Sequence, residues 1–282
     1  MDMKRSNAII FGKRSNLSIA LHERIENSLL VSGEEYFDRT FDLKLFQDTP
    51  NLQIIINSFY PSTMLNNVTN PKKYITDSIY LLSSILEEIK TLEMKNISKI
   101  IYTSSASVYG NNPRCKESDT PSPQNLYGSL KFSSEKLLEA FCTTMEIDYT
   151  VARIFNMYGG DDKFSIINKI LQSAKNQDSI TVVNNGNAIR DFIHIDDVAD
   201  AYITLLKEKN IHCINIASGI GISIKSIIDS IEKTGILLQK KYIDRNEINT
   251  SIASVDLLSK YSDIGSFIHV DDYITKVLFD NG

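Results

Sequence analysis

The stretch from Ile100 to Leu138 constrains the fold of this chain more than any other part of the sequence. It opens with the apolar run Ile100-Ile101-Tyr102, whose β-branched and aromatic side chains indicate a buried strand. The strand ends in a cluster of hydroxyl residues, Thr103, Ser104, Ser105 and Ser107, and a loop punctuated by proline leads on into a helix. Strands that alternate with helices in this way are typical of α/β proteins with a parallel sheet.

Two polar residues of the predicted helix, Tyr127 and Lys131, stand at positions i and i+4 and therefore project from one face. A free phenol titrates near pH ~10, and an adjacent ammonium favours the phenolate, so we expect a lowered pKa for Tyr127. Such a tyrosine can exchange a proton with a hydroxyl or a ketone. The Ser105 hydroxyl, from the end of the strand, can hydrogen-bond the same oxygen. A solvated helix face explains most Tyr-x-x-x-Lys pairs, and it is the segments described next that favour the prediction that Ser105, Tyr127 and Lys131 are catalytic.

Two segments further along the chain narrow this interpretation. The first is R-I-F-N-M-Y-G-G at 153–160, and the second is R-D-F-I-H-I-D-D-V-A-D-A at 190–201. Together with T-S-S-A-S-V-Y-G at 103–110, this ordered set resembles the extended short-chain dehydrogenase/reductase family, in particular its nucleotide-sugar epimerases, dehydratases and ketoreductases. The resemblance runs from about Asn57 to Ser230 and is weak before that.

The resemblance implies an α/β fold, with a Rossmann-like doubly wound parallel sheet and a smaller α/β lobe that binds substrate. Residues 1–155 and 191–216 are expected to form the dinucleotide-binding domain. Residues 156–190 and 217–282 are expected to form the nucleotide-sugar-binding lobe. A length of 282 residues suits one large domain with an appended lobe.

The loop after the first predicted strand, 8–11, departs from the family pattern. The glycines of G-x-x-G-x-x-G have become Gly12, Ser15 and Ser18, and serine is unfavourable wherever a positive φ is required. In a dinucleotide-binding unit this turn brings backbone N–H groups to a pyrophosphate. Lys13 and Arg14 can reach a 2′-phosphate, and family members with a basic residue there tend to use NADP.

The second predicted strand, 29–32, ends in Ser-Gly, where NAD-binding relatives place an acid for the ribose hydroxyls. NADP(H) is therefore favoured, and NAD(H) remains possible because Glu34 and Glu35 follow closely. The family helix between the second and third strands is expected to be missing or reduced to a turn. The resemblance implies further cofactor contacts at Asp42, Leu43, Asn57, Tyr127, Lys131 and Phe155.

Substrate contacts follow from the same resemblance. Arg190 matches the arginine that grips the diphosphate, which a guanidinium can bind with two hydrogen bonds. In the small ketoreductases that make CDP-paratose and CDP-abequose, an arginine lies three residues before a glutamate, whereas Arg245 lies two before Glu247 here. His194 is expected to be structural. The predicted substrate-binding residues are Ser105, Ser107, Asn156, Arg190, Arg245 and Glu247.

Composition excludes several classes of function. A net charge of −5 argues against nonspecific nucleic-acid binding, which normally needs a broad basic face. No apolar stretch approaches the ~20 residues that span a bilayer, and the polar start MDMKRSN is unlike a signal peptide, so a cytoplasmic protein is expected. The three cysteines lack metal-ligand spacing, so no metal is expected.

The residues after the strand-end hydroxyl bear on the reaction. The dehydratases of the family carry Asp-Glu there, and this chain carries Ala106-Ser107, which argues against dehydration. The basic first loop favours an NADPH-dependent reductase of the C4 ketone of a nucleotide-linked 4-keto-6-deoxy sugar, in the supply of sugars for surface polysaccharide. An NAD-dependent nucleotide-sugar 4-epimerase is the alternative, because the S-S-A-S-V-Y-G segment is most like that group.

The altered first loop also leaves room for a non-catalytic protein that kept the fold as a cofactor sensor or partner. The predicted ligand partner is a nucleotide-diphosphate sugar. By resemblance, the helices at 71–95 and 126–145 are expected to form a homodimer as a four-helix bundle.

Overall fold

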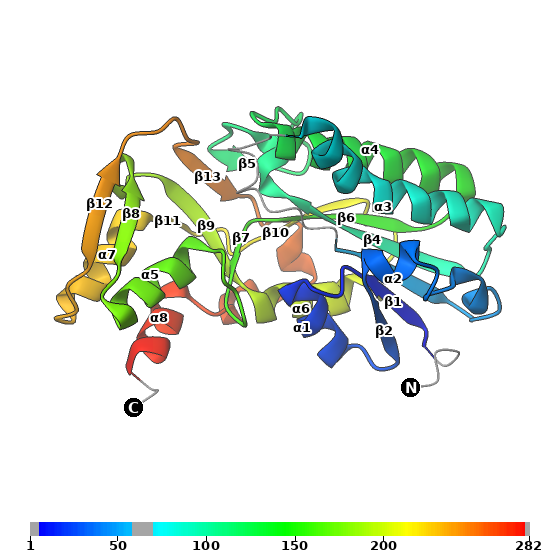
Figure 1. The fold of residues 1–282 in the computed structure, drawn as a ribbon, viewed down its shortest axis with the longest axis horizontal. Coiled ribbons are helices and arrows are strands. Elements are labelled where there is room, and N and C mark those ends of the chain that lie inside the picture. Colours follow the sequence, from blue (N-terminus) through cyan, green and yellow to red (C-terminus); the bar gives the residue numbers. More distant parts are fainter. Residues whose placement is uncertain (1–5, 58–69, 280–282) are drawn as a thin grey trace.

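The strands of the larger lobe form one parallel sheet (Figure 1). In this computed structural model, which describes residues 6–57 and 70–279, the strand order is β2-β1-β3-β4-β6-β10. The bounds are β1 Ala8–Phe11, β2 Ser28–Val31, β3 Leu52–Ile56, β4 Ile97–Ser105, β6 Tyr149–Ile154 and β10 Cys213–Ile216. Every neighbouring pair in this sheet is parallel. The predicted doubly wound α/β fold is therefore confirmed.

Alternation along the central strands explains why both faces of this sheet are covered. Ile54 and Ile56 pack into one hydrophobic cluster, whereas Ile55, between them, packs into the other. Successive side chains of a strand point to opposite faces, and a continuous apolar run is what a strand buried on both faces requires.

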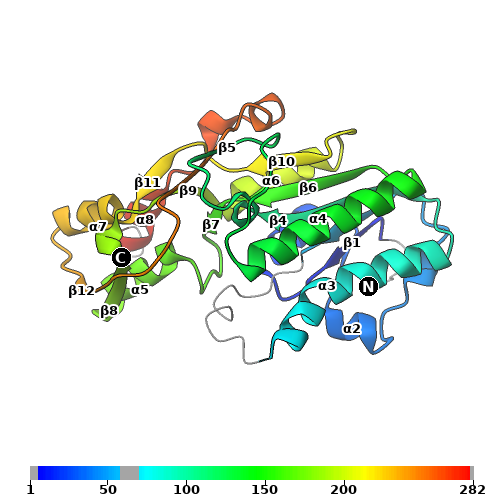
Figure 2. The ribbon, with the colours of Figure 1, turned by 90° about the horizontal axis from the view of Figure 1, so that it is seen from above.

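Helices cover each face of the sheet, as Figure 2 shows from above. α3 (Pro71–Thr91) and α4 (Leu126–Met145) lie side by side over one face, and α1 (Asn16–Arg24) and α6 (Ile195–Leu205) lie over the other. The short helix α2 (Gly33–Phe37) follows β2, and the 3-10 helices η2 (Leu43–Phe46) and η4 (Ala106–Tyr109) follow α2 and β4. Thus the helix after the second strand is reduced to five residues, close to the expected turn.

The smaller lobe holds two further sheets. One has the order β11-β9-β13-β5, with β7 paired to β9, and the other pairs β8 with β12. The strand bounds are β5 Arg114–Cys115, β7 Asn156–Tyr158, β8 Ser179–Val183, β9 Ile189–His194, β11 Gly221–Ser223, β12 Gln239–Ile243 and β13 Thr250–Ala253. The helices are α5 (Ile166–Asn176), α7 (Ile224–Lys233) and α8 (Val270–Phe279), with the 3-10 turn η5 (Asn184–Gly186). The 3-10 turns η6 (Leu258–Lys260) and η7 (Ile264–Ser266) pack instead against the hydrophobic cluster of the large sheet.

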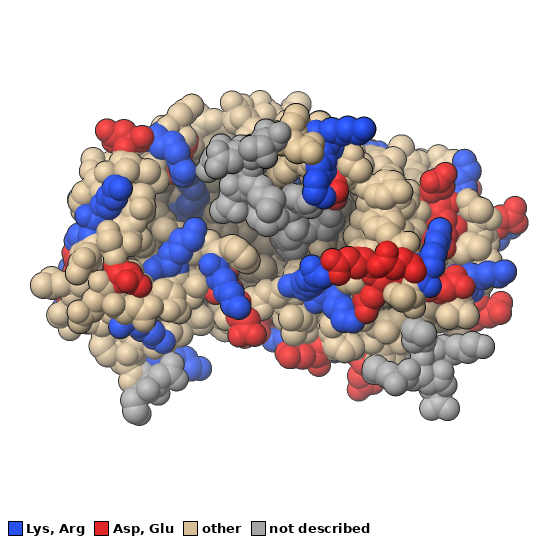
Figure 3. Space-filling view, viewed as in Figure 1, with Lys and Arg blue, Asp and Glu red and all other residues tan. Residues whose placement is uncertain are grey.

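The predicted domain division stays a prediction, and its ranges include residues 1–5, 58–69 and 280–282, which lie outside the described residues. Leu258, from the C-terminal segment, packs into the cluster under the large sheet. On the face shown in Figure 3, basic and acidic side chains are interspersed across both lobes. Within the described ranges, no helix is both long and apolar enough to span a membrane.

Candidate active site

The order of the strands places a ligand crevice at one point of the large sheet. The chain passes from β1 to β2 on one side and returns to β3 on the other side of β1. In open α/β sheets of this flavodoxin-like order, ligands bind outside the carboxyl ends of the strands at such a switch point. Gly12 follows β1 at this edge, and Asn57 follows β3.

The loop that starts at Gly12 fits a close approach of backbone to ligand. Gly12 has φ +100°, and a Cβ there would lie 2.2 Å from the Asn57 carbonyl oxygen, so only glycine fits. From residue 13 to residue 18 the backbone has no positive φ, and Ser15 has φ −74°. Ser15 and Ser18 therefore cause no backbone strain. The replacement of two glycines by serine, which was expected to be unfavourable for a cofactor loop, is compatible with this backbone.

The first turn of α1 has the features of an anion site. Ser15 precedes the helix, and its side chain makes no capping hydrogen bond. The first N–H groups of a helix lack partners within the helix, and they carry the positive end of its dipole. A diphosphate at this end of α1 would meet those N–H groups.

Ser18 and Asn57, both predicted cofactor contacts, use their side chains inside the protein. The Asn57 amide donates to Ser18 Oγ over 3.0 Å, and the Thr103 hydroxyl donates to Asn57 Oδ1. Thr103 Oγ1 also lies 2.7 Å from the Tyr202 hydroxyl. This buried chain of hydrogen bonds fixes α1 and the first loop to β3 and β4. Because both side chains are used inside the protein, only the backbone groups of Ser18 and Asn57 are available to a cofactor. Their contact with a cofactor stays a prediction.

The structure brings the three predicted catalytic residues together. Ser105 is the last residue of β4, and its side chain hydrogen-bonds the phenol of Tyr127 in the first turn of α4. Lys131 lies one turn further along, with its Nζ 6.0 Å from the centroid of the Tyr127 ring. The same ammonium donates to the Thr103 carbonyl oxygen over 2.8 Å. The site therefore stands at the carboxyl edge of the sheet.

The expected pKa of Tyr127 was wrong in direction. Burial raises the pKa of Tyr127 to about 12, and the hydrogen bond from Ser105 offsets only part of this rise. Burial also lowers the pKa of Lys131 to about 7, against the opposing charge of Glu135. Desolvation disfavours the charged form of both groups, and here it outweighs the Ser105 hydrogen bond at Tyr127 and the Glu135 charge at Lys131.

The start of α4, which carries Tyr127, is fixed by local contacts. The Asn125 side chain caps the helix by accepting from the Gly128 N–H over 2.8 Å. A Cβ at Gly128 would lie 2.6 Å from the Ser107 carbonyl oxygen, so the first turn packs directly on the segment after β4. The first turn of α4 is thereby held beside the Ser105 segment.

A buried ion pair beneath the site was not predicted from the sequence. Arg153 of β6 donates to both carboxylate oxygens of Glu135 on α4, over 2.7 and 3.1 Å, and Ser104 donates to the same carboxylate. Both charged side chains are at most 6% exposed. Two signals mark this pair in the sequence. Glu135 follows Lys131 by one helical turn, and Arg153 interrupts an apolar strand.

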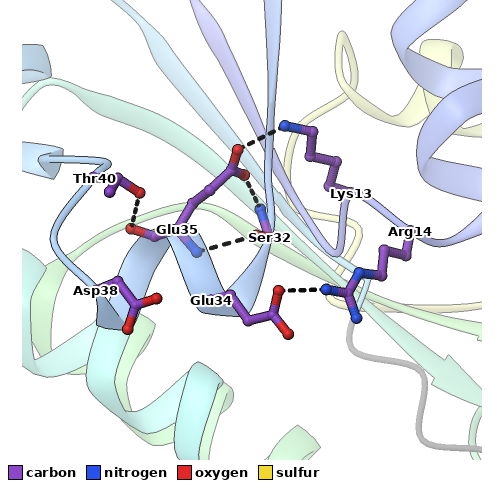
Figure 4. A pocket seen from close by; sticks show the side chains of 7 residues that line it. All are labelled: Lys13, Arg14, Ser32, Glu34, Glu35, Asp38 and Thr40. Atoms are coloured by element: carbon purple, nitrogen blue, oxygen red, sulfur yellow. Dashed lines mark hydrogen bonds and ion pairs between the residues drawn. The ribbon is translucent and has the colours of Figure 1, made fainter.

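The basic residues of the first loop are paired with acids of α2 (Figure 4). Lys13 Nζ lies 2.6 Å from Glu35 Oε1, and Arg14 forms an ion pair with Glu34. These four residues line a pocket of about 420 Å³, together with Ser32, Asp38 and Thr40. Any ligand phosphate in this pocket would therefore lie beside three carboxylates as well as two cations.

The remaining predicted cofactor residues differ in exposure. Asp42 is exposed and caps η2 through the Lys44 N–H, whereas Leu43 is fully buried in the hydrophobic core. Phe155 is 5% exposed and packs in a small cluster with Tyr109. The side chains of Leu43 and Phe155 therefore face protein, and contacts between these three residues and a cofactor remain predictions.

Three of the predicted substrate residues form one cluster in the smaller lobe. Arg190 Nη2 lies 3.2 Å from Glu247 Oε2, and Asn184 donates to Glu247 Oε1 over 3.0 Å. Asn184 also pairs with the backbone N–H and carbonyl of Arg245, over 3.0 and 2.6 Å. Asn184 was not predicted, and its place in an Asn-Asn-Gly turn is the signal that could have marked it. Burial lowers the pKa of Arg190.

Asn156, Ser107 and His194 complete the predicted set. The Asn156 amide donates to the Asp191 carbonyl over 2.8 Å, and Ser107 Oγ is buried without a partner in the described part of the chain. His194 caps α6 by accepting from the Asp196 N–H, and its ring packs on Tyr158. The structural role expected of His194 is the one that the structure shows. Among residues 6–57 and 70–279, no group of acids, histidines or cysteines could hold a metal ion.

The fold and the site together define a doubly wound α/β protein with a Ser-Tyr-Lys set at the carboxyl edge of its parallel sheet. Comparison with known proteins gives the family. The sequence model of the "NAD dependent epimerase/dehydratase family" matches residues 36–217, which is more than half of the chain. The chain belongs to this family of nucleotide-sugar epimerases and dehydratases, as the resemblance implied.

Individual relatives are distant. The chain is 26% identical to "Protein CapI" of Staphylococcus aureus over 87% of this chain and 79% of that one. It is 25% identical to a "UDP-glucose 4-epimerase" of Yersinia pestis, over 70% of this chain and 64% of that one.

Solved structures agree with the fold. A UDP-N-acetylglucosamine 4-epimerase from Methanobrevibacter ruminantium matches with a TM-score of 0.79 and 23% identity, covering 99% of this chain and 100% of that one. MoeE5, in complex with UDP-glucuronic acid and NAD, matches with a TM-score of 0.83 and 17% identity, covering 98% and 99%.

Proposed function

We propose that this chain is an NAD-dependent epimerase acting at C4 of a nucleotide-linked sugar. The observation that carries the proposal is the contact between Ser105 and Tyr127, with Lys131 one turn away, at the carboxyl edge of β4. Several relatives, from different organisms, bear the name of a 4-epimerase. The sequence favoured a 4-ketoreductase, and the ion pairs of the first loop change that preference.

The residues at the switch point fit a dinucleotide. Gly12 gives the close approach, and the uncapped first turn of α1 gives the N–H groups for a diphosphate. Lys13 and Arg14 are already neutralised by Glu35 and Glu34. A 2′-phosphate would add negative charge beside these carboxylates, so NAD fits this pocket better than NADP. The nicotinamide ring, when bound, supplies the acceptor and donor of hydride.

The chain's own residues would then act on the C4 oxygen of the sugar. The Ser105 hydroxyl would hydrogen-bond this oxygen and hold it in place. Tyr127 would exchange a proton with it. Lys131 would supply positive charge near the phenol. Because the pKa of Lys131 is about 7, this charge is present below neutral pH and is lost above it. In the smaller lobe, Arg190 would bind the diphosphate once it exchanges its contact with Glu247 for the ligand.

A 4-ketoreductase is the second candidate, and the protonation state of Tyr127 favours it. Because its pKa is raised to about 12, the phenol holds its proton at neutral pH. A phenol in this state is ready to donate a proton to a C4 ketone, which is the direction of a reductase. The epimerase needs the opposite transfer in its first step.

Cofactor use separates the two candidates. The protein is purified without added nucleotide, any bound cofactor is released and identified, and NADH and NADPH are titrated by fluorescence. NAD that survives purification in stoichiometric amounts supports the epimerase. Exchangeable binding that prefers NADPH overturns it in favour of the reductase. Binding of neither cofactor would revive the non-catalytic alternative.

A further inference from the structure

Asn16 joins the proposed cofactor loop to the smaller lobe. It is the first residue of α1, and its side-chain amide donates to the Gly159 carbonyl over 2.9 Å. The oxygen of the same amide accepts from the Asp161 N–H over 3.3 Å. One side chain thus pairs with the backbone of residues 159–161 in both directions, as a neighbouring strand would.

Residues 159–161 leave little room for adjustment. A Cβ at Gly160 would lie 3.0 Å from Asn16 Nδ2, and a Cβ at Gly159 would lie 2.2 Å from His194 Nε2. The segment is therefore held between the first turn of α1 on one side and the start of α6 on the other. It directly follows β7, whose first residue is Asn156.

The C-terminal end of α1 is bound to α6. Arg24 donates to Asp196 over 2.5 Å and to Asp200 over 3.3 Å, both on α6. The helices α1 and α6 pack against each other on the same face of the large sheet. Because α1 is anchored at its other end as well, a shift at its first turn acts on the 159–161 segment through Asn16.

We infer that Asn16 is a positioning residue that couples the binding of cofactor and nucleotide sugar. This inference rests on the proposed function, which places the cofactor diphosphate at the first turn of α1, and on the prediction that Asn156, just before residues 159–161, contacts the nucleotide sugar. The contact between Asn16 and residues 159–161 forms without a ligand, so either ligand, by adding contacts on its own side, would further restrict the motion of the segment that the other ligand contacts. The second ligand then binds a segment that is already ordered and binds more tightly.

The test is the affinity for NAD with and without a saturating nucleotide diphosphate, with UDP and CDP as the probes. Wild type should bind NAD about fivefold more tightly, or better, when the probe is present. In Asn16→Ala this ratio should fall to about one. Glu23→Ala, at an exposed position of the same helix, should keep the wild-type ratio. An unchanged ratio in Asn16→Ala, or a ratio of one in wild type that binds both ligands, would overturn the inference.

A second variant perturbs the same contact from the smaller lobe. Gly160→Ala places a methyl group against the Asn16 amide without substituting a residue of the cofactor loop. The ratio of NAD affinities with and without the nucleotide diphosphate should therefore fall in this variant as well. The effects of the two variants on the ratio should not add when combined, since both remove one contact. Additive effects would count against the inference. Wild type that binds neither NAD nor NADPH would refute the proposed function itself, and with it this inference.

Discussion

At the scale of single residues, burial decides the charges of the site. Lys131 is 5% exposed, and the positive charge that the sequence suggested for it is opposed by the loss of water. The sequence shows that Tyr127 and Lys131 share a helix face, but it cannot show how deeply that face is buried. This is why the positions of the catalytic residues were predictable and the direction of the Tyr127 pKa shift was not.

The lowered pKa of Lys131 predicts a dependence of stability on pH. Between the folded value of about 7 and the unfolded value of 10.5, the unfolded chain binds more protons, so stability rises with pH in this window. The slope for one such group reaches about 1.4 kcal/mol per pH unit. Lys131→Met lacks this term. Its free energy of unfolding relative to wild type should therefore decrease as pH rises from about 7 to about 9.

Urea unfolding at several pH values measures this difference. Lys136→Met, on an exposed face of the same helix, is the control and should run parallel to wild type. If the Lys131→Met and wild-type curves are parallel as well, the burial of this ammonium has been misjudged.

Gly12 is predicted to tolerate no side chain. In Gly12→Ala the new Cβ would meet the Asn57 carbonyl at 2.2 Å, so the end of β3 must move. Gly235 also has a positive φ, +95°, yet nothing lies within 4 Å of its Cβ position. Gly235→Ala should lose about 1–2 kcal/mol from backbone strain alone, and Gly12→Ala about 3 kcal/mol or more. Equal losses in urea unfolding would refute this account of the loop.

At the scale of elements, α4 is positioned by a charge pair as well as by apolar packing. Arg153 and Glu135 join β6 to α4 directly below the catalytic residues. Removal of one partner leaves the other charge buried and unpaired, which is strongly destabilising. The pair therefore fixes where along β4 and β6 the helix can sit.

Glu135→Gln is expected to lower the free energy of unfolding by about 3–5 kcal/mol. Glu139, on the same helix, pairs with Lys136 in an exposed position, with side chains 47% and 60% exposed. Glu139→Gln should therefore change stability by less than about 1 kcal/mol. Chemical denaturation of the two variants gives the comparison, and similar losses would show that the buried pair has no special role.

The ion pairs between the first loop and α2 predict cofactor choice. In the double variant Glu34→Gln and Glu35→Gln, the cations of the loop are released for a phosphate. The ratio of NADPH to NADH affinity should rise about two- to fivefold, as expected for the loss of exposed pairs. Glu23→Gln, at an exposed position of α1 outside this pocket, is the control. A ratio that stays at its wild-type value in fluorescence titrations would contradict this role of the acids.

Most elements were predictable because periodicity and caps agree in them. The strand expected at 8–11 has those bounds, the helix expected at 71–95 begins at Pro71 and ends at Thr91, and the helix expected at 126–145 spans Leu126–Met145. The helix α5 begins only at Ile166, because the Asp162 carboxylate accepts from the N–H groups of Phe164 and Ser165 and holds this segment in a turn. The β8–β12 pair depends on contacts between distant segments, which local patterns do not contain.

At the scale of the whole molecule, the residues proposed for the site come from both lobes. The first loop belongs to the large sheet, the Arg190 cluster to the smaller lobe, and Asn16 bridges them. The family resemblance predicted Arg190, Arg245 and Glu247 as separate substrate contacts and did not predict that they form one cluster. The hydrogen bonds of Asn184 and Asn16 depend on loop geometry, and no sequence motif predicts them. The homodimer through the helices at 71–95 and 126–145 stays a prediction.

The most direct test of the central claim is a search for C4 epimers in a reaction with NAD and the sugars named in the relatives. Wild type should convert at least one of UDP-glucose, UDP-N-acetylglucosamine and UDP-glucuronic acid to its C4 epimer, resolved by chromatography. Tyr127→Phe should lower this rate by about 10²-fold or more while leaving the fold intact. Wild type that binds NAD and forms no epimer from any of the three, or a Tyr127→Phe variant as active as wild type, would contradict the account.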